Sequence, residues 1–257
     1  MQIEKYPLPE WLANWIDYPG FLWRPYSIII SVLLIFQTMY SGGKCRFLAW
    51  KCVDDLDRYS DVYYQFHLFI IKAFRIQLHV EAVQAEFLNK KKSLLIMSNH
   101  QSNIDIPLIT AAFKGPLRMV AKKSLSEIPF FGWGAKYKGH ILVDRSSKNS
   151  REQTKLDIID RIKEKKLSVW LAPEGTRSKD GSLGKFKKGS FKVAIDNNIS
   201  LLVISIRGAF AANPKSHILV RTGSVVHLTF SDFIEDTQSF SVDDLQNRVR
   251  NNIQNFI

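Results

Sequence analysis

The sequence predicts an α/β fold: a mixed, largely parallel sheet flanked by helices, preceded by an N-terminal membrane-associated helical pair. From Glu81 onward, short apolar runs alternate with helical stretches, a pattern typical of parallel sheets with covering helices. Before residue 80 the chain is instead rich in aromatic residues and long apolar stretches. We therefore divide the 257 residues into a membrane-embedded or interfacial helical segment, 1–80, and an α/β domain, 81–257.

The first apolar segment contains no charged residue between Arg24 and Lys44. This length is close to the roughly 20 residues that a bilayer-spanning helix requires. Amphipathic aromatic residues flank the segment, as at a membrane interface: Trp11, Trp15, Trp23 and Tyr26 before it and Tyr40 after it. Basic residues follow the segment, and if it spans a membrane this end should face the cytoplasm: Lys44, Arg46, Lys51 and Arg58.

A second segment, Asp61–His79, is also apolar but carries Lys72 and Arg75. It is a poorer candidate for a span, and it fits an interfacial helix or the return leg of a shallow hairpin. The alternative is that both N-terminal segments are core helices of a globular protein.

The α/β domain is expected to contain seven strands and four helices. The strands are expected at Ser93–Ser98, Leu117–Ala121, His140–Val143, Ser168–Leu171, Ile199–Ile206, His217–Arg221 and Val225–Phe230. The helices are expected at Ile106–Phe113, Ser150–Lys165, Gly189–Asn197 and Val242–Phe256.

Composition limits the class of partner. The formal net charge of +12 favours an anionic one, such as nucleic acid, an acidic membrane surface or a phosphorylated substrate. Cys45 and Cys52 stand without a histidine cluster, so we expect neither a disulfide framework nor a metal site.

The first candidate site is Asn99-His100-Gln-Ser-Asn-Ile-Asp105, directly after a predicted strand. Sites in α/β proteins lie at the carboxyl ends of parallel strands. A histidine there can act as a general base, and a carboxylate can orient its ring. The alternative is a loop histidine, with Asp105 as a helix N-cap and Pro107 in the first turn.

Two further candidates also follow predicted strands. In Pro-Glu174-Gly175-Thr176-Arg177-Ser, glycine permits close approach of a ligand, and arginine offers a fork of donors that suits phosphate. Glu174 could orient Arg177 or hold a substrate hydroxyl, or the motif could be a polar turn with a surface ion pair. Arg145, after His140–Val143, is a second candidate phosphate ligand or a solvated loop residue. Lysines near these motifs suggest an anion-binding mouth: Lys122, Lys123, Lys136, Lys138, Lys185, Lys187, Lys188 and Lys192.

Together these blocks resemble the glycerolipid acyltransferase family, and within it the 1-acylglycerol-3-phosphate acyltransferases. The family's blocks occur in order over roughly residues 90–210: Asn-His-Gln-Ser-Asn-Ile-Asp, then Lys122-Lys-Ser-Leu with Pro129-Phe-Phe-Gly, then Gly139-His-Ile-Leu-Val-Asp-Arg145, then Pro-Glu-Gly-Thr-Arg-Ser. One block departs: Leu201–Ile206 stands where the family has a strand close to Val-Pro-Val-x-Pro. That block is associated with donor and acceptor binding, so the departure leaves the acceptor open.

The resemblance implies transfer of a fatty acyl group from a thioester, acyl-CoA or acyl carrier protein, to the free hydroxyl of lysophosphatidic acid. His100 and Asp105 would be catalytic, and Arg145 and Arg177 would bind the acceptor phosphate. We expect Glu174, Gly175 and Thr176 to contribute to substrate binding, and Lys122 to stabilise the oxyanion. No cofactor is expected, and the active site should face the cytoplasmic side of a membrane.

Other functions stay open at this point. The acceptor could be another lysophospholipid, glycerol-3-phosphate or an acylated amino-acid lipid. A non-catalytic basic module for anionic lipid or nucleic acid would fit the charge, but the apolar N-terminus and the lack of a nucleic-acid motif argue against a nucleic-acid partner. A serine hydrolase would need a G-x-S-x-G elbow, which the sequence lacks.

Overall fold

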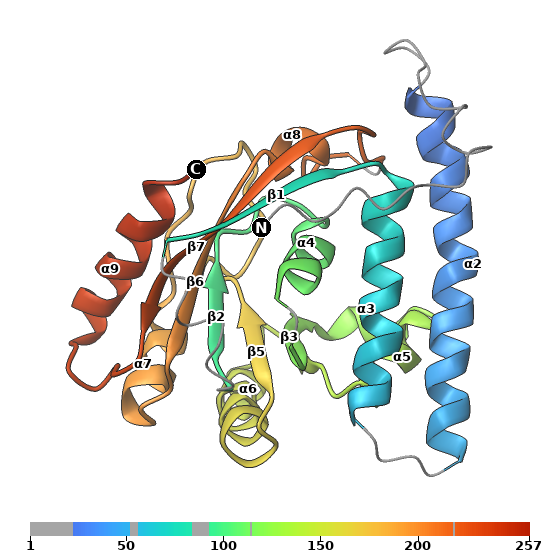
Figure 1. Ribbon diagram of the computed structural model, residues 1–257. Helices are drawn as coiled ribbons and strands as arrows, with labels where there is room; N and C mark the ends of the chain where they lie inside the picture. Colours follow the sequence, from blue (N-terminus) through green and yellow to red (C-terminus); the bar gives the residue numbers. More distant parts are fainter. Residues whose placement is uncertain (1–22, 52–55, 84–92, 114, 218) are drawn as a thin grey trace.

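The computed structural model describes residues 23–51, 56–83, 93–113, 115–217 and 219–257. These residues form a seven-stranded sheet in the order β1-β7-β6-β2-β5-β3-β4, with helices on both faces (Figure 1). Neighbouring strands are parallel except β6 and β7, which are antiparallel. The predicted largely parallel α/β fold is therefore confirmed. Trp11, Trp15 and Cys52 lie outside the described residues.

The strands are β1 (Gln77–Ala82), β2 (Leu95–Ser98), β3 (Leu117–Lys122), β4 (Ile141–Val143), β5 (Ser168–Leu171), β6 (Leu201–Arg207) and β7 (Val225–Ile234). The α-helices are α2 (Trp23–Trp50), α3 (Leu56–Ala73), α4 (Asp105–Ala112), α5 (Phe131–Tyr137), α6 (Lys148–Ile159), α7 (Lys188–Asp196), α8 (Ala209–Ala212) and α9 (Val242–Gln254). A 3₁₀ turn, η3 (Lys123–Glu127), follows β3, and a π-helical turn, η4 (Asp160–Glu164), continues α6.

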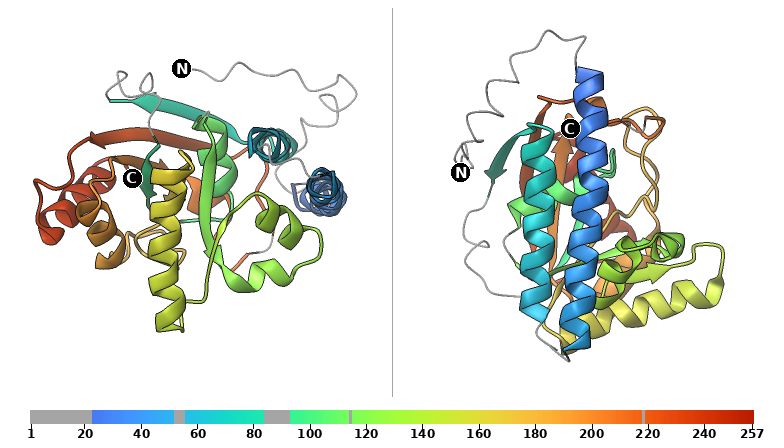
Figure 2. Two further views of the ribbon diagram at one scale, coloured as in Figure 1. Left: turned by 90° about the horizontal axis from the view of Figure 1, so that it is seen from below. Right: turned by 90° about the vertical axis from the view of Figure 1, so that its right-hand side faces the viewer.

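The central strands separate two apolar layers. All residues of β2 and β5 are buried, which explains why both strands read as continuous apolar runs in the sequence. Alternate side chains of β2 point to opposite layers: Ile96 packs on the side of α3 and α4, and Leu95 and Met97 pack on the side of α7 and α9. Figure 2 shows the two layers of helices on either side of the sheet.

One predicted strand is wrong, and one strand was not predicted. The described residues of His217–Arg221 form a loop, in which the Asn213 side chain donates to the carbonyls of His217 and Leu219. The segment expected as Asp61–His79 is two elements, because α3 ends at Ala73 and β1 follows. Arg75, with φ of 53°, makes the turn between them. As an edge strand with alternating polar residues, β1 lacks the apolar signal of the central strands.

Strand β7 continues four residues beyond its predicted end at Phe230. Its buried Asp232 carboxylate accepts hydrogen bonds from Arg248 Nε and Nη2 at 2.8 and 3.0 Å, and from Asn252 Nδ2 at 3.0 Å. Both partners lie on α9. Polar residues therefore extend a strand here because a helix distant in sequence pairs with them.

Helices α2 and α3 lie side by side at one end of the sheet (Figure 1), and the views of Figure 2 agree. The stretch Pro25–Leu48 of α2 is, among the described residues, the one helix long and apolar enough to cross a membrane. Its 24 residues span about 36 Å at 1.5 Å per residue, against about 30 Å for a hydrocarbon core. Large apolar side chains are exposed along it: Ile28, Ile29, Val32, Leu33, Ile35, Phe36, Met39 and Tyr40.

Helix α3 differs from α2, because its C-terminal end is part of the protein core. Ile71, Ala73 and Phe74 are buried together with residues of α4 and the sheet. The interpretation of both segments as core helices thus fits the end of α3 and does not fit α2, whose apolar face has few protein neighbours.

Helix α2 packs against α5 at a glycine. A Cβ atom on Gly42 would lie 2.2 Å from the backbone carbonyl oxygen of Phe130, whereas a Cβ on the next residue, Gly43, would have no heavy atom within 4 Å. The two helices can therefore approach this closely only because residue 42 has no side chain.

Gly42→Ala is expected to lower the free energy of unfolding by about 1–3 kcal/mol, because the backbone of Phe130 cannot move aside without separating α2 from α5. Gly43→Ala is the matched control, and its higher helix propensity should stabilise the protein by about 0.5–1 kcal/mol. Thermal unfolding of the detergent-solubilised protein measures both. Equal midpoints for the two variants would contradict the packing.

Candidate active site

The motifs singled out in the sequence meet at one edge of the sheet. His100 follows β2, Lys122 ends β3, Arg145 follows β4 and the Glu174–Arg177 turn follows β5. These four strands are parallel neighbours or next neighbours in the sheet, so their carboxyl ends lie along a common edge. This is where α/β proteins build their sites.

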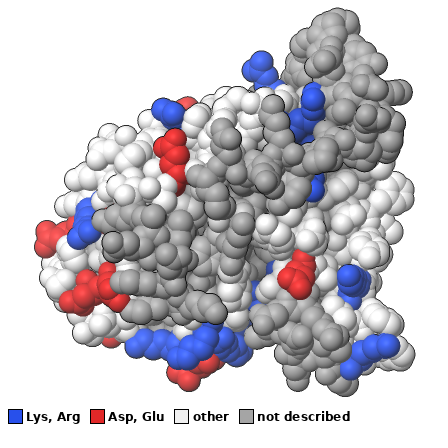
Figure 3. Space-filling model, viewed as in Figure 1, with Lys and Arg blue, Asp and Glu red and all other residues white. Residues whose placement is uncertain are grey.

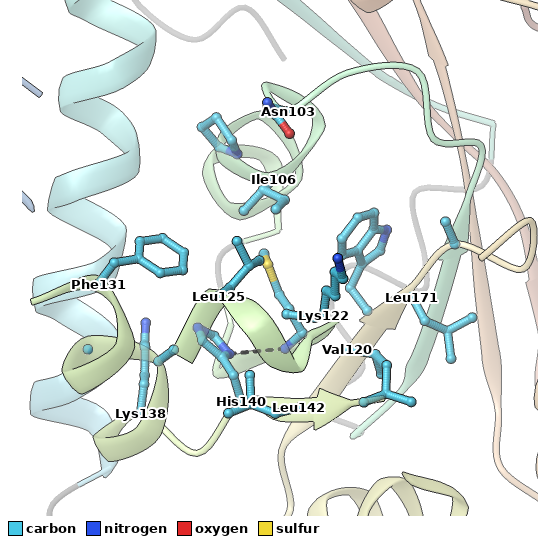
Figure 4. A pocket seen from close by; sticks show the side chains of 18 of the residues that line it. Asn103, Ile106, Val120, Lys122, Leu125, Phe131, Lys138, His140, Leu142 and Leu171 are labelled. Carbon is cyan, nitrogen blue, oxygen red and sulfur yellow. Dashed lines mark hydrogen bonds between the residues drawn. The ribbon is translucent and has the colours of Figure 1, made fainter. Parts of the chain in front are cut away.

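A cavity of about 1570 Å³ opens at this edge and extends between the sheet and the N-terminal helices. Its polar part is lined by His100, Gly175, Thr176, Arg177, Arg145 and Lys122. Its apolar part is lined by side chains of α2, α3, α4, β3 and α5, including Leu34, Ile70, Ile106, Val120 and Phe131. Figure 4 shows Ile106, Leu125, Phe131 and Leu142 around this apolar part. The cavity thus joins a polar mouth to a long apolar interior.

His100 and Asp105 contact each other directly. His100 Nδ1 lies 2.7 Å from Asp105 Oδ2. The same oxygen accepts the backbone N–H groups of Gln101 at 2.8 Å and Ser102 at 2.9 Å. One carboxylate oxygen therefore closes the turn between β2 and α4 and holds the imidazole at the same time.

The contact decides the tautomer of His100. A carboxylate accepts and cannot donate, so Nδ1 carries the hydrogen and Nε2 keeps its lone pair. The imidazole borders the cavity with its side chain 17% exposed. A neutral ring in this state can take a proton from a group in the cavity.

Asp105 does not cap α4. The helix begins at Asp105, its N-cap is Ile104, and no side chain bonds to the cap. The carboxylate turns back toward residues 100–102 and is completely buried. Its other oxygen, Oδ1, has no hydrogen-bond partner among the described residues. Leaving a buried acceptor unsatisfied costs about 1–3 kcal/mol, a cost that is usual at functional sites.

The backbone of His100 is held by the turn after β5. Glu174 Oε1 accepts the His100 N–H at 2.8 Å, and Glu174 Oε2 accepts the Gly184 N–H at 2.8 Å. On the other side, the Ser178 N–H donates to the His100 carbonyl at 2.7 Å. Burial raises the pKa of the Glu174 carboxyl, while the two N–H groups act in the opposite direction. The two motifs are therefore one hydrogen-bonded unit.

This gives Glu174 a different place from the one that the sequence suggested. Its side chain is 6% exposed and does not border the cavity, and its oxygens are already used by backbone donors. We therefore assign it a positioning role in place of direct contact with substrate or an ion pair with Arg177.

Two residues whose roles could not be predicted from the sequence complete the support. The Asn99 amide donates to the Ile206 carbonyl at 2.8 Å and accepts the Ile206 N–H at 2.9 Å, which ties the end of β2 to β6. Trp170 of β5 donates to Ser98 Oγ at 2.9 Å, and its ring meets the His100 imidazole edge to face at 5.5 Å. The sequence carries only weak signals for these two residues: Trp170 lies in an apolar strand, and Asn99 begins the motif that contains His100.

Basic side chains surround the polar mouth. Nη1 of Arg177 is buried and has no hydrogen-bond partner among the described residues. Lys215 Nζ, which the sequence analysis also missed, donates to Thr176 Oγ1 at 3.0 Å and to the Arg177 carbonyl at 3.3 Å. Among the described residues, Glu152 is the single carboxylate of the lining. The lining also includes further cations: Lys122, Arg145, Arg151, Lys155 and Lys187.

Gly175 is needed for the shape of this turn. Its φ of +73° lies in the left-handed region, and a Cβ there would come within 2.8 Å of Lys187 Nζ. The turn thus keeps Lys187 close to the backbone at the mouth.

The excess of basic residues is not confined to the cavity. On the face shown in Figure 3, Lys and Arg side chains also gather along the lower edge, where α6 lies in Figure 1. The net charge alone therefore does not locate the site, whereas the lining residues do.

The departure from the family's fourth block does not reach the cavity. Leu201–Ile206 lies in β6, is buried, and contributes no lining residue. Ser205 Oγ lies 3.3 Å from Ser231 Oγ and 3.4 Å from the Asn252 carbonyl, on the side of α9. The missing prolines thus do not alter the described walls.

Comparisons with known proteins agree with the motifs. Residues 79–207 match the model of the family described as Acyltransferase. The 1-acyl-sn-glycerol-3-phosphate acyltransferase of Escherichia coli is 30% identical over 173 residues, covering 67% of this chain and 71% of that protein. The enzyme of the same name from Saccharomyces cerevisiae is 30% identical over 176 residues, covering 67% and 58%.

The fold is shared with a solved structure. The crystal structure of the 1-acyl-sn-glycerophosphate acyltransferase from Thermotoga maritima superposes with a TM-score of 0.72 at 24% identity, covering 92% of this chain and 93% of that one. Shared sequence blocks, the extent of the family match and the common fold lead to one conclusion: the chain belongs to the acyltransferase family.

Proposed function

We propose that this protein is a membrane-bound O-acyltransferase that moves a fatty acyl group from a thioester to the free glycerol hydroxyl of lysophosphatidic acid, giving phosphatidic acid. The observation that carries the proposal is an imidazole oriented by a buried carboxylate where a basic mouth meets a long apolar cavity. The named activity of the relatives from E. coli and S. cerevisiae supports this choice of acceptor.

In the proposed reaction, Nε2 of His100 takes the proton from the acceptor hydroxyl. The hydroxyl oxygen attacks the carbonyl carbon of the thioester at the same time. Asp105 offsets the positive charge that develops on the ring. Collapse of the tetrahedral intermediate breaks the C–S bond, and the proton passes from the imidazole to the leaving thiolate. Lys122 or a loop N–H would stabilise the oxyanion.

The acceptor phosphate would bind at the polar mouth. The buried Nη1 of Arg177 offers an unused donor there, and Arg145 and Lys215 add positive charge. A planar guanidinium suits the oxygens of a phosphate. The acyl chain would fill the apolar part of the cavity.

The donor would be acyl-CoA or an acylated carrier protein, both acidic and therefore compatible with the basic mouth. A thioester is already an activated acyl group. The proposed mechanism therefore includes no cofactor, no metal and no covalent acyl-enzyme.

Helix α2 would hold the protein at the membrane. Its exposed apolar face suits lipid. Lys44 and Arg46 in its C-terminal half and Lys51 just after it suit the cytoplasmic side. Because α2 also lines the cavity from Ser31 to Cys45, lipid substrates could enter the site from the bilayer.

His100→Ala and Asp105→Asn are expected to lower kcat by about 10²–10⁴-fold, because the first removes the base and the second removes the anion that fixes its tautomer. The assay follows labelled acyl transfer to lysophosphatidic acid. Asp157→Asn, which changes a partly buried carboxylate on α6 outside the cavity, is the control and should retain full activity. Near-wild-type turnover in either site variant would refute the mechanism.

Arg177→Met should raise the KM for lysophosphatidic acid by about tenfold or more with a smaller effect on kcat, because a charged hydrogen bond to the phosphate is lost. The preference over monoacylglycerol, which lacks the phosphate, should fall by a similar factor. Lys179→Met, exposed two residues away and outside the lining, serves as the control. An unchanged preference would rule out the phosphate contact.

Membrane attachment through α2 predicts that high salt leaves the protein in the membrane pellet and that detergent releases it, since apolar burial is not screened by ions. Replacing Ile28, Val32 and Ile35 by lysine should move the protein toward the soluble fraction. Release of the wild-type protein by salt alone would contradict this attachment.

A further inference from the structure

The apolar part of the cavity contains a group of polar side chains that the proposed reaction does not use. Tyr63 and His67 come from α3, Lys138 is the C-cap residue of α5, and His140 precedes β4. We call these four residues the inner polar cluster. Each of them borders the cavity, and Lys138 is only 2% exposed.

The cluster is compact. The ring of Tyr63 lies 3.9 Å from that of His67 and 4.9 Å from that of His140, centroid to centroid. Lys138 Nζ lies 3.3 Å from the centre of the Tyr63 ring. Figure 4 shows Lys138 and His140 side by side at this end of the cavity, with the Lys138 amine directed into it.

Two ring nitrogens of the cluster, His67 Nδ1 and His140 Nε2, are buried and have no hydrogen-bond partner among the described residues. His140 Nδ1 accepts the Met119 N–H at 3.1 Å, so the hydrogen of the neutral ring is on Nε2. Lys138 has no ion pair with a carboxylate of the described residues. Tyr63, by contrast, uses its hydroxyl in a 3.0 Å contact with Met119 Sδ.

Other polar groups face the cluster and decide its character. The buried Arg118, Cys45 of α2 and Asp61 of α3 are close enough to affect the pKa of Lys138 electrostatically. His67 interacts with the backbone of Tyr63. Burial, followed by Arg118, lowers the pKa of Lys138 well below its usual value. An amine that is less readily protonated than an ordinary lysine attracts a carboxylate less strongly, and its N–H groups can still donate to a neutral hydroxyl.

The cluster lies away from the reacting end of the cavity. Met119 pairs with Trp170 across β3 and β5, and Trp170 is the residue whose ring meets His100. The cluster stands on the far side of Met119, which contacts both Tyr63 and His140. A donor whose carbonyl is at His100 would therefore reach the cluster with its alkyl chain.

A purely alkyl chain matches the polarity of the inner polar cluster poorly. It would displace water without replacing the water's hydrogen bonds, and an unsatisfied buried polar group costs about 1–3 kcal/mol. An oxygen on the chain would restore these bonds.

We propose that the inner polar cluster binds a hydroxyl group carried along the acyl chain, so that the protein prefers hydroxylated acyl donors. This inference rests on the proposed acyl transfer.

The test compares acyl-CoA donors of one chain length, unsubstituted or hydroxylated at successive carbons, with lysophosphatidic acid as acceptor and full-length protein in detergent. One range of hydroxyl positions should exceed the unsubstituted donor about tenfold in kcat/KM, as expected for one buried hydrogen bond, and positions outside it should not. Equal kcat/KM for all donors would overturn the inference.

Lys138→Met keeps the length of the side chain and removes its nitrogen. The preference for the hydroxylated donor should fall severalfold, while transfer of the unsubstituted chain is maintained or improved. Lys136→Met, on the exposed side of the same helix, is the control and should keep the wild-type preference. An unchanged preference in Lys138→Met would also overturn the assignment.

A binding measurement separates this inference from the proposed function. Calorimetry with non-reactive thioether analogues of the same donors reports the affinity of the wild-type protein without turnover. Tighter binding of one hydroxylated analogue supports the cluster even if lysophosphatidic acid is not the acceptor, whereas equal affinities overturn it. Absence of transfer from the unsubstituted donor to lysophosphatidic acid would refute the proposed function alone.

Discussion

The buried carboxylate of Asp105 holds together the segment on which the site depends. Its Oδ2 receives three donors within 2.9 Å, two from the backbone of Gln101 and Ser102 and one from the His100 ring. A carboxylate removed from water is costly, and these donors offset that cost only in one conformation of the turn. The chain therefore leaves β2, turns and enters α4 with the imidazole in a single orientation.

A second carboxylate, that of Glu174, extends this constraint to the neighbouring strand. Because β5 is adjacent to β2 in the sheet, the turn after β5 can bind the backbone of His100 through Glu174 and Ser178. The same turn presents Thr176 and Arg177 to the mouth of the cavity. Sheet order thus couples the position of the base to the position of the proposed phosphate ligand, and the helices α2, α3 and α5 supply the apolar interior.

The elements that could be predicted from the sequence are those whose signal is local. Central strands such as β2 and β5 are buried on both faces and read as apolar runs, and α9 follows an N-cap serine, Ser241. Edge strand β1 could not be recognised, since its polar residues resemble a loop, and the extension of β7 depends on Arg248 of a distant helix. His217–Arg221 has strand-like residues, but it forms the loop that Asn213 binds.

The residues of the candidate site likewise divide into those that have a local signal in the sequence and those that do not. The proximity of His100 and Asp105 follows from their short separation at the end of a strand, and their placement agrees with the expectation, although their roles stay predictions. The function of Glu174 could not be deduced, because its partners, His100 and Gly184, are set by strand order. Lys215, Tyr63 and His67 come from segments that carry no motif, and His140 lies in a family block in which no role was predicted for it. Packing brings these side chains to the cavity.

The most direct test of this account is the kinetics of Glu174→Gln, in which an amide must place its NH₂ group against either the His100 or the Gly184 N–H. With folding verified by circular dichroism, kcat should fall about tenfold or more while the KM for lysophosphatidic acid changes little, because the base is displaced and the mouth is intact. Glu152→Gln, which lines the cavity but does not touch His100, should retain the wild-type kcat. A wild-type kcat in Glu174→Gln would contradict the claim that the two carboxylates together place the imidazole.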